Sequence, residues 1–122
     1  CKVVKKNSRI SKLVLVNSKY QCVADNTHTT FNTAKGVPYM EGHHLIPCTY
    51  SNAQNFWKTK GRNIDCIENI VCLCPTCHRK IHFGSSDEKR KLIKLLYEKQ
   101  IEKLSDANIA ISLNELYTYY GL

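Results

Sequence analysis

The stretch from Glu41 to His82 most constrains what this chain can fold into, because it concentrates side chains that bind metals. It contains four of the five histidines and five of the seven cysteines of a 122-residue sequence. An odd number of cysteines clustered with histidines favours metal binding in a reducing compartment over a disulfide framework. We therefore expect one small cytoplasmic domain that is stabilised by a metal ion, and the strands and helices predicted below make it an α+β domain.

One predicted metal site is built on Cys74 and Cys77, because the C-x2-C spacing lets two thiolates bind one tetrahedral ion. Cys22 and His28 lie in the polar segment 22–38, which reads as a loop or loose hairpin. Together the four residues form a Cys3His set that would tie this early loop to a later helix. A small domain gains much stability from such a cross-link, so the expected cofactor is a structural Zn²⁺ ion.

The histidines predict a second, catalytic metal site. His78 and His82 are four residues apart on a helix predicted from Pro75 onwards, which brings both imidazoles to one face. His43 and His44 are neighbours on a predicted strand, so they point to opposite sides and should have different roles. One strand histidine would complete a three-histidine site with open positions, while the other takes a proton from water.

The motifs around these residues resemble those of HNH nucleases, which have the ββα-metal fold. The matching motifs are Glu41-Gly42-His43-His44-Leu45-Ile46-Pro47, Glu68-Asn69-Ile70-Val71 and Leu73-Cys74-Pro75-Thr76-Cys77-His78 through His82. The resemblance implies metal ligands at His43, His78 and His82, the last matching the HxxxH pair of colicin-type nuclease toxins. It also implies a general base at His44 and, at Asn69, a residue that pins the loop between the strands.

The function implied by the resemblance is metal-dependent hydrolysis of phosphodiester bonds in DNA rather than RNA, with 5′-phosphate and 3′-hydroxyl products. The motif wording is similar to HNH domains of bacterial restriction and phage-defence proteins. Three imidazoles favour Mn²⁺, Ni²⁺, Co²⁺ or Zn²⁺ over Mg²⁺, although the working ion stays open among these five. The alternatives are a zinc-stabilised module that binds nucleic acid without cutting it, and an interaction domain of a larger protein.

One departure from the family pattern leaves the fourth zinc ligand open. Many zinc-containing members carry an additional C-x2-C pair earlier in the sequence. Here Asp25 stands where the second cysteine of that pair would be, three residues after Cys22. We choose His28 as the ligand, with Asp25 or another cysteine as the alternative. Cys66 and Cys72 are the competing thiols, although a cysteine flanked by apolar residues on a strand is ordinarily a small buried side chain.

An excess of basic residues, 18 Lys+Arg against 10 Asp+Glu, suits a polyanionic partner such as DNA. Five basic residues lie near the motifs in sequence and could bind flanking phosphates, a role that competes with simple surface solvation. They are Arg79, Lys80, Lys58, Lys60 and Arg62. The neighbouring rings of Phe56 and Trp57 are expected to pack onto the core rather than to stack on bases.

The chain divides into a basic N-terminal arm (1–21), a metal-binding core (22–84) and C-terminal helices that pack on the core (85–122). In the arm, Ile10, Leu13, Val14 and Val16 predict one face of a short helix capped by Asn7 or Ser8, with a strand as the alternative.

Within the core we expect strands over 37–46 and 70–73, separated by an exposed loop over 48–68. The helix from Pro75 should end at Gly84. Capping boxes that begin at Ser85 and Ser112 then predict a long helix and a short terminal one.

No segment approaches the ~18 apolar residues of a membrane span, so no membrane partner is expected. Since the sequence begins at Cys1 rather than methionine, we expect other domains of a longer chain as partners. A homodimer stays open, because cutting both DNA strands with one active site requires two copies or sequential nicking.

Overall fold

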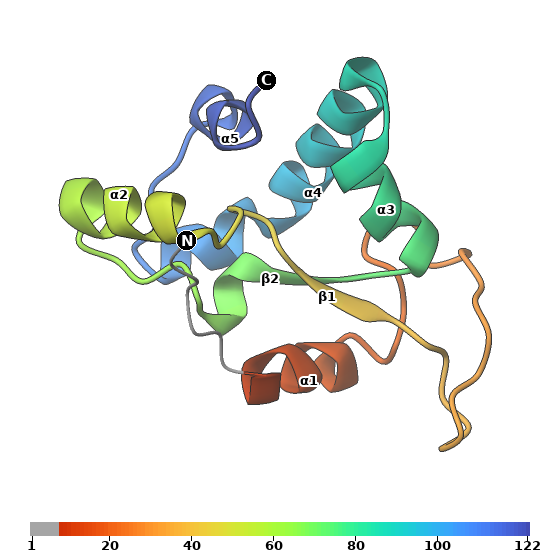
Figure 1. Cartoon of the computed structure of the whole chain (residues 1–122). Coiled ribbons are helices and arrows are strands. Elements are labelled where there is room, and N and C mark those ends of the chain that lie inside the picture. The colour runs from red at the N-terminus through yellow and green to blue at the C-terminus, as the bar shows by residue number, and fades with distance from the viewer. Residues whose placement is uncertain (1–7) are drawn as a thin grey trace.

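The computed structural model describes residues 8–122, which fold into an α+β domain with a small central sheet (Figure 1). The start of the basic arm, with the expected helix cap Asn7, lies outside the described residues. The elements are α1 (Ser8–Asn17), β1 (Glu41–His44), α2 (Tyr50–Lys60), the 3-10 helix η1 (Ile67–Asn69), β2 (Ile70–Leu73), α3 (Pro75–Phe83), α4 (Ser86–Asp106) and α5 (Leu113–Tyr119). This is the ββα core with flanking helices that the sequence predicts.

The described sheet consists of β1 and β2, which run antiparallel and pair His43 with Val71 and His44 with Ile70. Helix α1 lies on one side of this sheet, and α3 and α4 lie on the other (Figure 1). Gly42 faces α1, because a Cβ atom built there would be 3.1 Å from Oγ of Ser11. A larger residue at position 42 would therefore require the side chain of Ser11 to shift.

The strand predicted over 37–46 is too long, since β1 covers only four of its residues. Upstream of β1, Asn32 and Pro38 form an isolated antiparallel bridge, and Tyr39 N–H donates to the carbonyl of Phe31. These contacts close the loose hairpin expected within the segment 22–38. Only a few backbone groups pair there, because the small polar residues offer little apolar surface to pack against a longer ladder.

Helix α1 confirms the helix expected in the basic arm. Val14 is buried, but Leu13 and Val16 are 45% and 54% exposed. The helix face predicted to be apolar is therefore rotated by part of a turn from the face that packs in the structure. Helix α1 contacts the sheet through the side of Ser11 and Val14, which are three residues apart.

Helix α2 corrects the exposed loop predicted over 48–68. The Thr49 hydroxyl caps the helix by accepting from the N–H of Asn52, and Gly61 ends it in the left-handed conformation at φ 69°. Phe56 packs into the core as expected, whereas Trp57 is 61% exposed. The two aromatic neighbours are separated because only one of them lies on the helix face that meets the core.

The last three helices follow their predicted signals. Pro75 occupies the first turn of α3, and Gly84 ends it. Ser85 caps α4 with its hydroxyl, and Ser112 and Glu115 form a reciprocal capping box before α5.

The hydrophobic core is formed by β2 and the inner faces of α2, α3, α4 and α5. Its largest fully buried side chains are Phe56, Leu45, Ile46, Ile64, Ile70, Leu73, Ile81, Ile93, Leu96, Leu104, Ile109 and Leu116. This core holds the end of β1 against α3. Within residues 8–122, every helix is too short or too polar to span a bilayer.

Candidate functional site

Three histidines from β1 and α3 meet on one side of the sheet. The ring centres of His43, His78 and His82 form a nearly equilateral triangle, with separations of 5.1 Å, 5.2 Å and 5.0 Å. His43 is buried, His78 is half-buried and His82 is exposed. The cluster therefore opens to solvent on the side of α3.

This triangle has the dimensions of a metal site. One nitrogen from each ring can be chosen so that all three atoms lie within 4.8 Å of one another. A tetrahedral ion about 2.0 Å from three imidazole nitrogens would hold the ring centres about 5 Å apart. The three residues therefore fit a divalent transition-metal ion and would leave a coordination position for another ligand.

Two of the three clustered histidines, His78 and His43, each have a hydrogen-bond partner outside the triangle. Nδ1 of His78 donates to Oε1 of Glu41 at 2.9 Å, and Oε2 of Glu41 accepts from the hydroxyl of Tyr39 at 2.8 Å. Burial would raise the pKa of Glu41, but the bonds from His78 and Tyr39, with the nearby charge of Arg79, lower it. Glu41 is therefore an anion that holds Nδ1 of His78 protonated and leaves Nε2 as the metal-binding nitrogen.

His43 makes a different outer contact. Its Nε2 atom lies 2.8 Å from the hydroxyl of Tyr120, which also lies 2.5 Å from the carbonyl oxygen of Leu45. Tyr120 directly follows α5, so the chain's last helix reaches the histidine cluster.

His44 points to the opposite side of β1, as predicted for adjacent strand residues. Nε2 of His44 donates to Oδ1 of Asp65 at 2.8 Å, and both side chains are largely buried. The chain bends at Leu45 and Ile46, immediately after the strand. Because β1 ends there, His44 still lines the same cavity of about 340 Å³ as the three clustered histidines.

Asn69 holds the segment that follows His44. Its side-chain oxygen accepts from the N–H of Ile46 at 2.8 Å, and its amide nitrogen donates to the carbonyls of Ile46 and Ile64. The backbone carbonyl of Asn69 also accepts from the N–H of Leu45 at 2.8 Å. A fully buried amide with these bonds ties the segment after His44 to Ile64 and to the 3-10 helix before β2.

The predicted zinc residues also come together. Cys22, His28, Cys74 and Cys77 each place a ligand atom within 4.8 Å of the others. Nδ1 of His28 lies 3.3 Å from Sγ of Cys77 and 3.7 Å from Sγ of Cys74. In a tetrahedral zinc site, such a nitrogen and sulfur would be about 3.6 Å apart. The cluster therefore has the composition and size of a closed structural zinc site.

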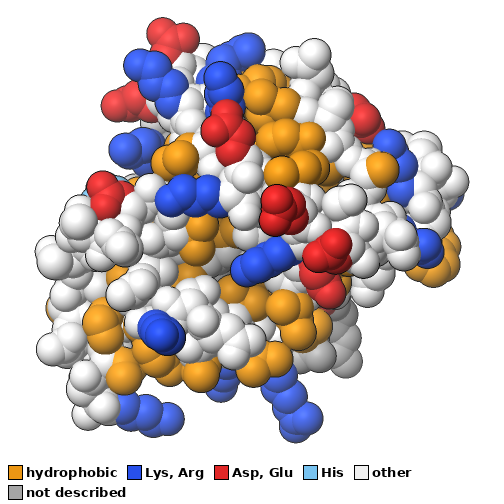
Figure 2. All heavy atoms as spheres, turned by 180° about the vertical axis from the view of Figure 1, so that it is seen from behind, with side chains coloured by type: hydrophobic (Ala, Val, Ile, Leu, Met, Phe, Trp, Pro, Cys, Tyr) orange, Lys and Arg blue, Asp and Glu red, His pale blue; other side chains and the backbone are white. Residues whose placement is uncertain are grey.

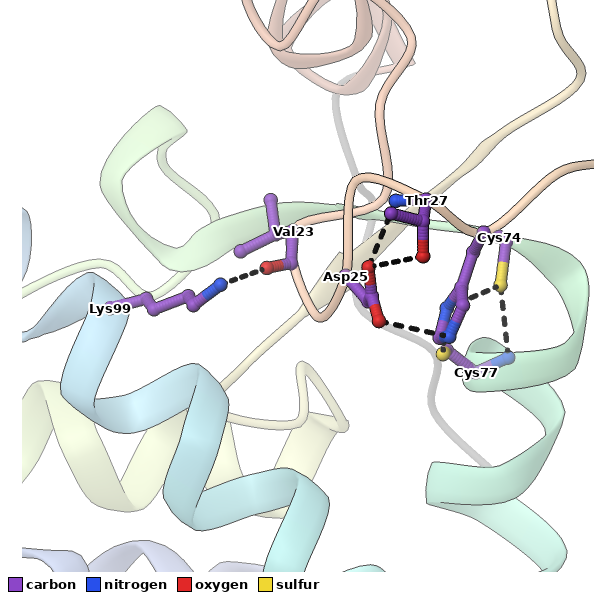
Figure 3. A network of polar contacts seen from close by, with 7 residues as sticks. Val23, Asp25, Thr27, Cys74, Cys77 and Lys99 are labelled. Carbon is purple, nitrogen blue, oxygen red and sulfur yellow. Dashed lines mark hydrogen bonds and ion pairs between the residues drawn. The ribbon is translucent and has the colours of Figure 1, made fainter.

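The loop carrying Cys22 and His28 is held by neighbouring elements (Figure 3). Asp25 accepts from both the backbone and the hydroxyl of Thr27, and its other oxygen lies 3.8 Å from Nε2 of His28. Lys99 of α4 donates to the carbonyl of Val23 at 2.8 Å. The geometry favours His28 over Asp25 as the fourth ligand, because Asp25 contacts the outer nitrogen of His28 instead of joining the thiols.

The thiols of this cluster differ in their ionisation. Burial would raise the pKa of Cys22, but hydrogen bonds from the backbone of Cys74, Asp25 and Ala24 and from His28 lower it to about 7. Burial raises the pKa of Cys77 well above its ordinary value. At neutral pH, roughly half of the Cys22 thiol is therefore ionised, whereas Cys77 needs a cation to lose its proton.

The competing cysteines lie outside the cluster. All six cysteines within residues 8–122 are free thiols, in keeping with the preference for metal over disulfides. Burial raises the pKa of Cys72 to about 12 and also raises that of Cys66. Cys72 is a buried residue of β2, as its apolar neighbours in the sequence predict.

The basic residues near α2 have different surroundings. Nζ of Lys60 pairs with the carboxylate of Glu115 at 3.2 Å, so it helps to hold α5 on α2. Arg62 and Lys58 are exposed. Of these three, Lys60 is therefore the one paired with a carboxylate, which competes with phosphate.

The two basic residues of α3 lie on different sides of the helix. Arg79 is near enough to Glu41 to lower the pKa of that carboxyl group, which places a cation beside the histidine cluster. Lys80 lines a cavity beside the cysteine cluster with His28 and Cys77. On the face drawn in Figure 2, basic side chains are scattered among acidic and apolar ones.

Sequence reasoning missed three residues of this site. Glu41 lies two residues before His43 on the same strand face, so the two-residue strand period could have identified it. Asp65 and Tyr120 carry no local signal, because each reaches its histidine through tertiary packing.

Known proteins resemble this chain in sequence and in fold. The profile of the family described as HNH endonuclease matches residues 22–84. The type IV methyl-directed restriction enzyme EcoKMcrA of Escherichia coli (strain K12) is 32% identical over 96 residues, which cover 79% of this chain and 30% of that enzyme. The chain thus spans less than a third of that relative's length.

Among solved structures, the type IV phosphorothioation-dependent restriction endonuclease ScoMcrA has a similar fold, with a TM-score of 0.57 at 21% identity. The match covers 86% of this chain and 18% of ScoMcrA. The shared fold extends well beyond residues 22–84 and so includes parts of the flanking helices.

Proposed function

Because the chain belongs to the HNH endonuclease family, we propose that it hydrolyses phosphodiester bonds of DNA in a metal-dependent reaction that serves restriction or phage defence. The observation that carries the proposal is the placement of His44 in one cavity with the three-histidine cluster. The identity with EcoKMcrA, a restriction enzyme, supports DNA as the substrate.

His44 is the general base of the proposed reaction. Its Nε2 atom donates to Asp65, so the lone pair of the neutral ring lies on Nδ1. Nδ1 takes a proton from the water that attacks phosphorus, and the Asp65 carboxylate stabilises the imidazolium that forms. Asn69 keeps the segment after His44 in place and so orients the base.

His43, His78 and His82 would hold the divalent ion, which when bound stabilises negative charge on the phosphate and on the leaving oxygen. Glu41 orients His78 from behind. The bond from phosphorus to the 3′ oxygen breaks, and that oxygen takes a proton from solvent water, which leaves a 5′-phosphate and a 3′-hydroxyl. Arg79 beside Glu41 is the basic residue best placed to contact a flanking phosphate.

We assign structural support to the cysteine cluster, with Zn²⁺ as its ion. We also assign recognition of modified or specific DNA to other domains of a longer protein, since EcoKMcrA is more than three times as long as the segment it shares with this chain.

A plasmid-cleavage assay tests the proposal. Wild-type protein is incubated with supercoiled DNA and each of Mn²⁺, Ni²⁺, Co²⁺, Zn²⁺ and Mg²⁺, beside the His44→Ala variant. We expect cleavage by the wild type and a loss of about 10²–10⁴-fold in the variant, because a positioned general base contributes about that much. DNA affinity and zinc content should be unchanged in the variant.

The proposal fails if folded, zinc-containing wild type cuts neither duplex DNA, single-stranded DNA nor RNA with any of these ions. Salt-dependent DNA binding that survives His44→Ala, without cleavage by either protein, would instead identify a zinc-stabilised binding module.

A further inference from the structure

Tyr120 contacts the histidine cluster from outside the segment that defines the family. The family match ends at residue 84, whereas Tyr120 directly follows α5 near the end of the chain. Its hydroxyl lies between two groups at the end of β1, the carbonyl of Leu45 and Nε2 of His43. Each neighbours His44 in sequence, so Tyr120 touches the strand on both sides of the proposed base.

The position of Tyr120 is determined by several contacts of the C-terminal segment. Leu116 of α5 is fully buried in the core. The N–H of Tyr120 donates to the carbonyl of Tyr117, and the N–H of Gly121 donates to that of Thr118. Gly121 has a φ of 74°, which lets the chain turn directly after Tyr120 without strain. The phenol is therefore held by the fold as well as by its own hydrogen bonds.

Proton counting determines the direction of both hydrogen bonds. A phenol has one proton, and the carbonyl oxygen of Leu45 can only accept, so the 2.5 Å contact is donated by Tyr120. The same oxygen must then accept at 2.8 Å from Nε2 of His43, which has to carry a proton. A tyrosine phenol ordinarily titrates at about pH 10, so it keeps its proton at neutral pH.

We infer that Tyr120 is a positioning residue that holds His43 in the Nε2-protonated form and thereby assigns Nδ1 of His43 to the metal. This inference rests on the proposed role of His43 as a ligand. Metal-binding histidines commonly donate their second nitrogen to an outer partner, which selects the ligating nitrogen and the ring orientation. In this chain a neutral phenol serves His43, whereas the Glu41 carboxylate serves His78.

The first test needs no substitution. Long-range ¹H–¹⁵N NMR spectra are recorded for the full chain with zinc at the cysteine cluster and no other divalent ion. We expect His43 to be protonated at Nε2, with Nδ1 showing the shift of a nitrogen that carries a lone pair. A His43 ring protonated at Nδ1 instead would overturn the inference, whatever the behaviour of any variant.

The second test compares Tyr120→Phe with Tyr119→Phe. Tyr119 is the adjacent residue, and its hydroxyl accepts from Asn55 instead of contacting a histidine, so it is a matched control for the loss of one phenol oxygen. Ni²⁺ is titrated calorimetrically into each zinc-containing protein. We expect Tyr120→Phe to bind Ni²⁺ about 10–100-fold more weakly, and Tyr119→Phe to stay within about twofold of wild type.

The outcomes separate this inference from the proposed function. Wild type that binds Ni²⁺ with the expected His43 form, but cuts no nucleic acid, would leave the inference intact and remove the function. Wild type that cuts DNA, together with a Tyr120→Phe protein that keeps its Ni²⁺ affinity and its His43 form, would remove the inference and leave the function.

Discussion

The cysteine cluster and the histidine cluster lie side by side on α3 but are built differently. The cysteine cluster has four donor residues, three buried thiols and the exposed His28, whereas the histidine cluster has three donors, of which only His43 is buried. Closed four-donor sites are typical of structural zinc, and open three-donor sites are typical of catalytic metals. Donor number is thus what supports our proposal of a structural role for the cluster of Cys77 and a catalytic role for that of the adjacent His78.

The two clusters also differ in the groups that form hydrogen bonds to their metal-binding side chains. Backbone groups surround the thiol of Cys22 and lower its pKa, so the loop itself prepares a ligand. The histidines depend on side chains from distant elements, namely Glu41 and Tyr120. The cysteine cluster should therefore determine whether the domain folds, and the histidine cluster whether it acts.

The largest expected effect comes from Cys74→Ser, which should disable both clusters. Loss of a ligand from a structural zinc site removes metal-binding energy that serves folding, so we expect zinc loss and at least about 3 kcal/mol of destabilisation. Because Cys74 is the N-cap of α3, Ni²⁺ binding at the histidines should also disappear. Elemental analysis, thermal unfolding and calorimetry measure the three effects.

Cys66→Ser is the matched control, since Cys66 is a half-buried thiol outside the cluster. It should keep its zinc. Full zinc content in Cys74→Ser together with loss of zinc in Cys66→Ser would show that the cluster has been assigned to the wrong thiols.

An intermediate effect is expected for His82→Ala, which should affect the histidine cluster alone. His82 is exposed near the end of α3, and alanine favours helix, so the free energy of unfolding should change by less than about 1 kcal/mol. Ni²⁺ affinity should fall by at least about 100-fold, more than the loss of an outer partner would cause. A marked fall in thermal stability with zinc release would contradict the separation of the two clusters.

The smallest effect is expected for Asp65→Asn, which alters the base without touching either cluster. The amide can still accept from Nε2 of His44, but it no longer provides a negative charge to the imidazolium. We expect kcat for DNA cleavage to fall about tenfold, with KM, zinc content and Ni²⁺ affinity unchanged. Asp106→Asn, at the exposed end of α4, serves as the control. Equal rates for the two variants would exclude a role for Asp65.

Local sequence signals predicted much of the fold. The C-x2-C spacing, the proline in the first turn of α3 and Gly84 at its end specify a helix that presents two cysteines and two histidines. The Ser85 and Ser112 caps specified α4 and α5 because capping depends on residues within one turn. The same logic could have found α2 from Thr49 and Gly61, but the polar composition of the segment concealed it.

Contacts between distant segments could not be predicted in this way. Asp65 is 21 residues from His44, and Tyr120 is 77 residues from His43. No periodicity relates such pairs, because their approach depends on how α2 and α5 pack against the end of β1.

The sequence by itself determined which residues can bind metals, which helices present them and which family the chain resembles, because these depend on spacing over a few residues. The tertiary structure alone decided that His28 faces the thiols, that Asp65 supports His44 and that Tyr120 reaches His43. Such hydrogen bonds form only after the core has brought donor and acceptor atoms of distant segments within about 3 Å of each other.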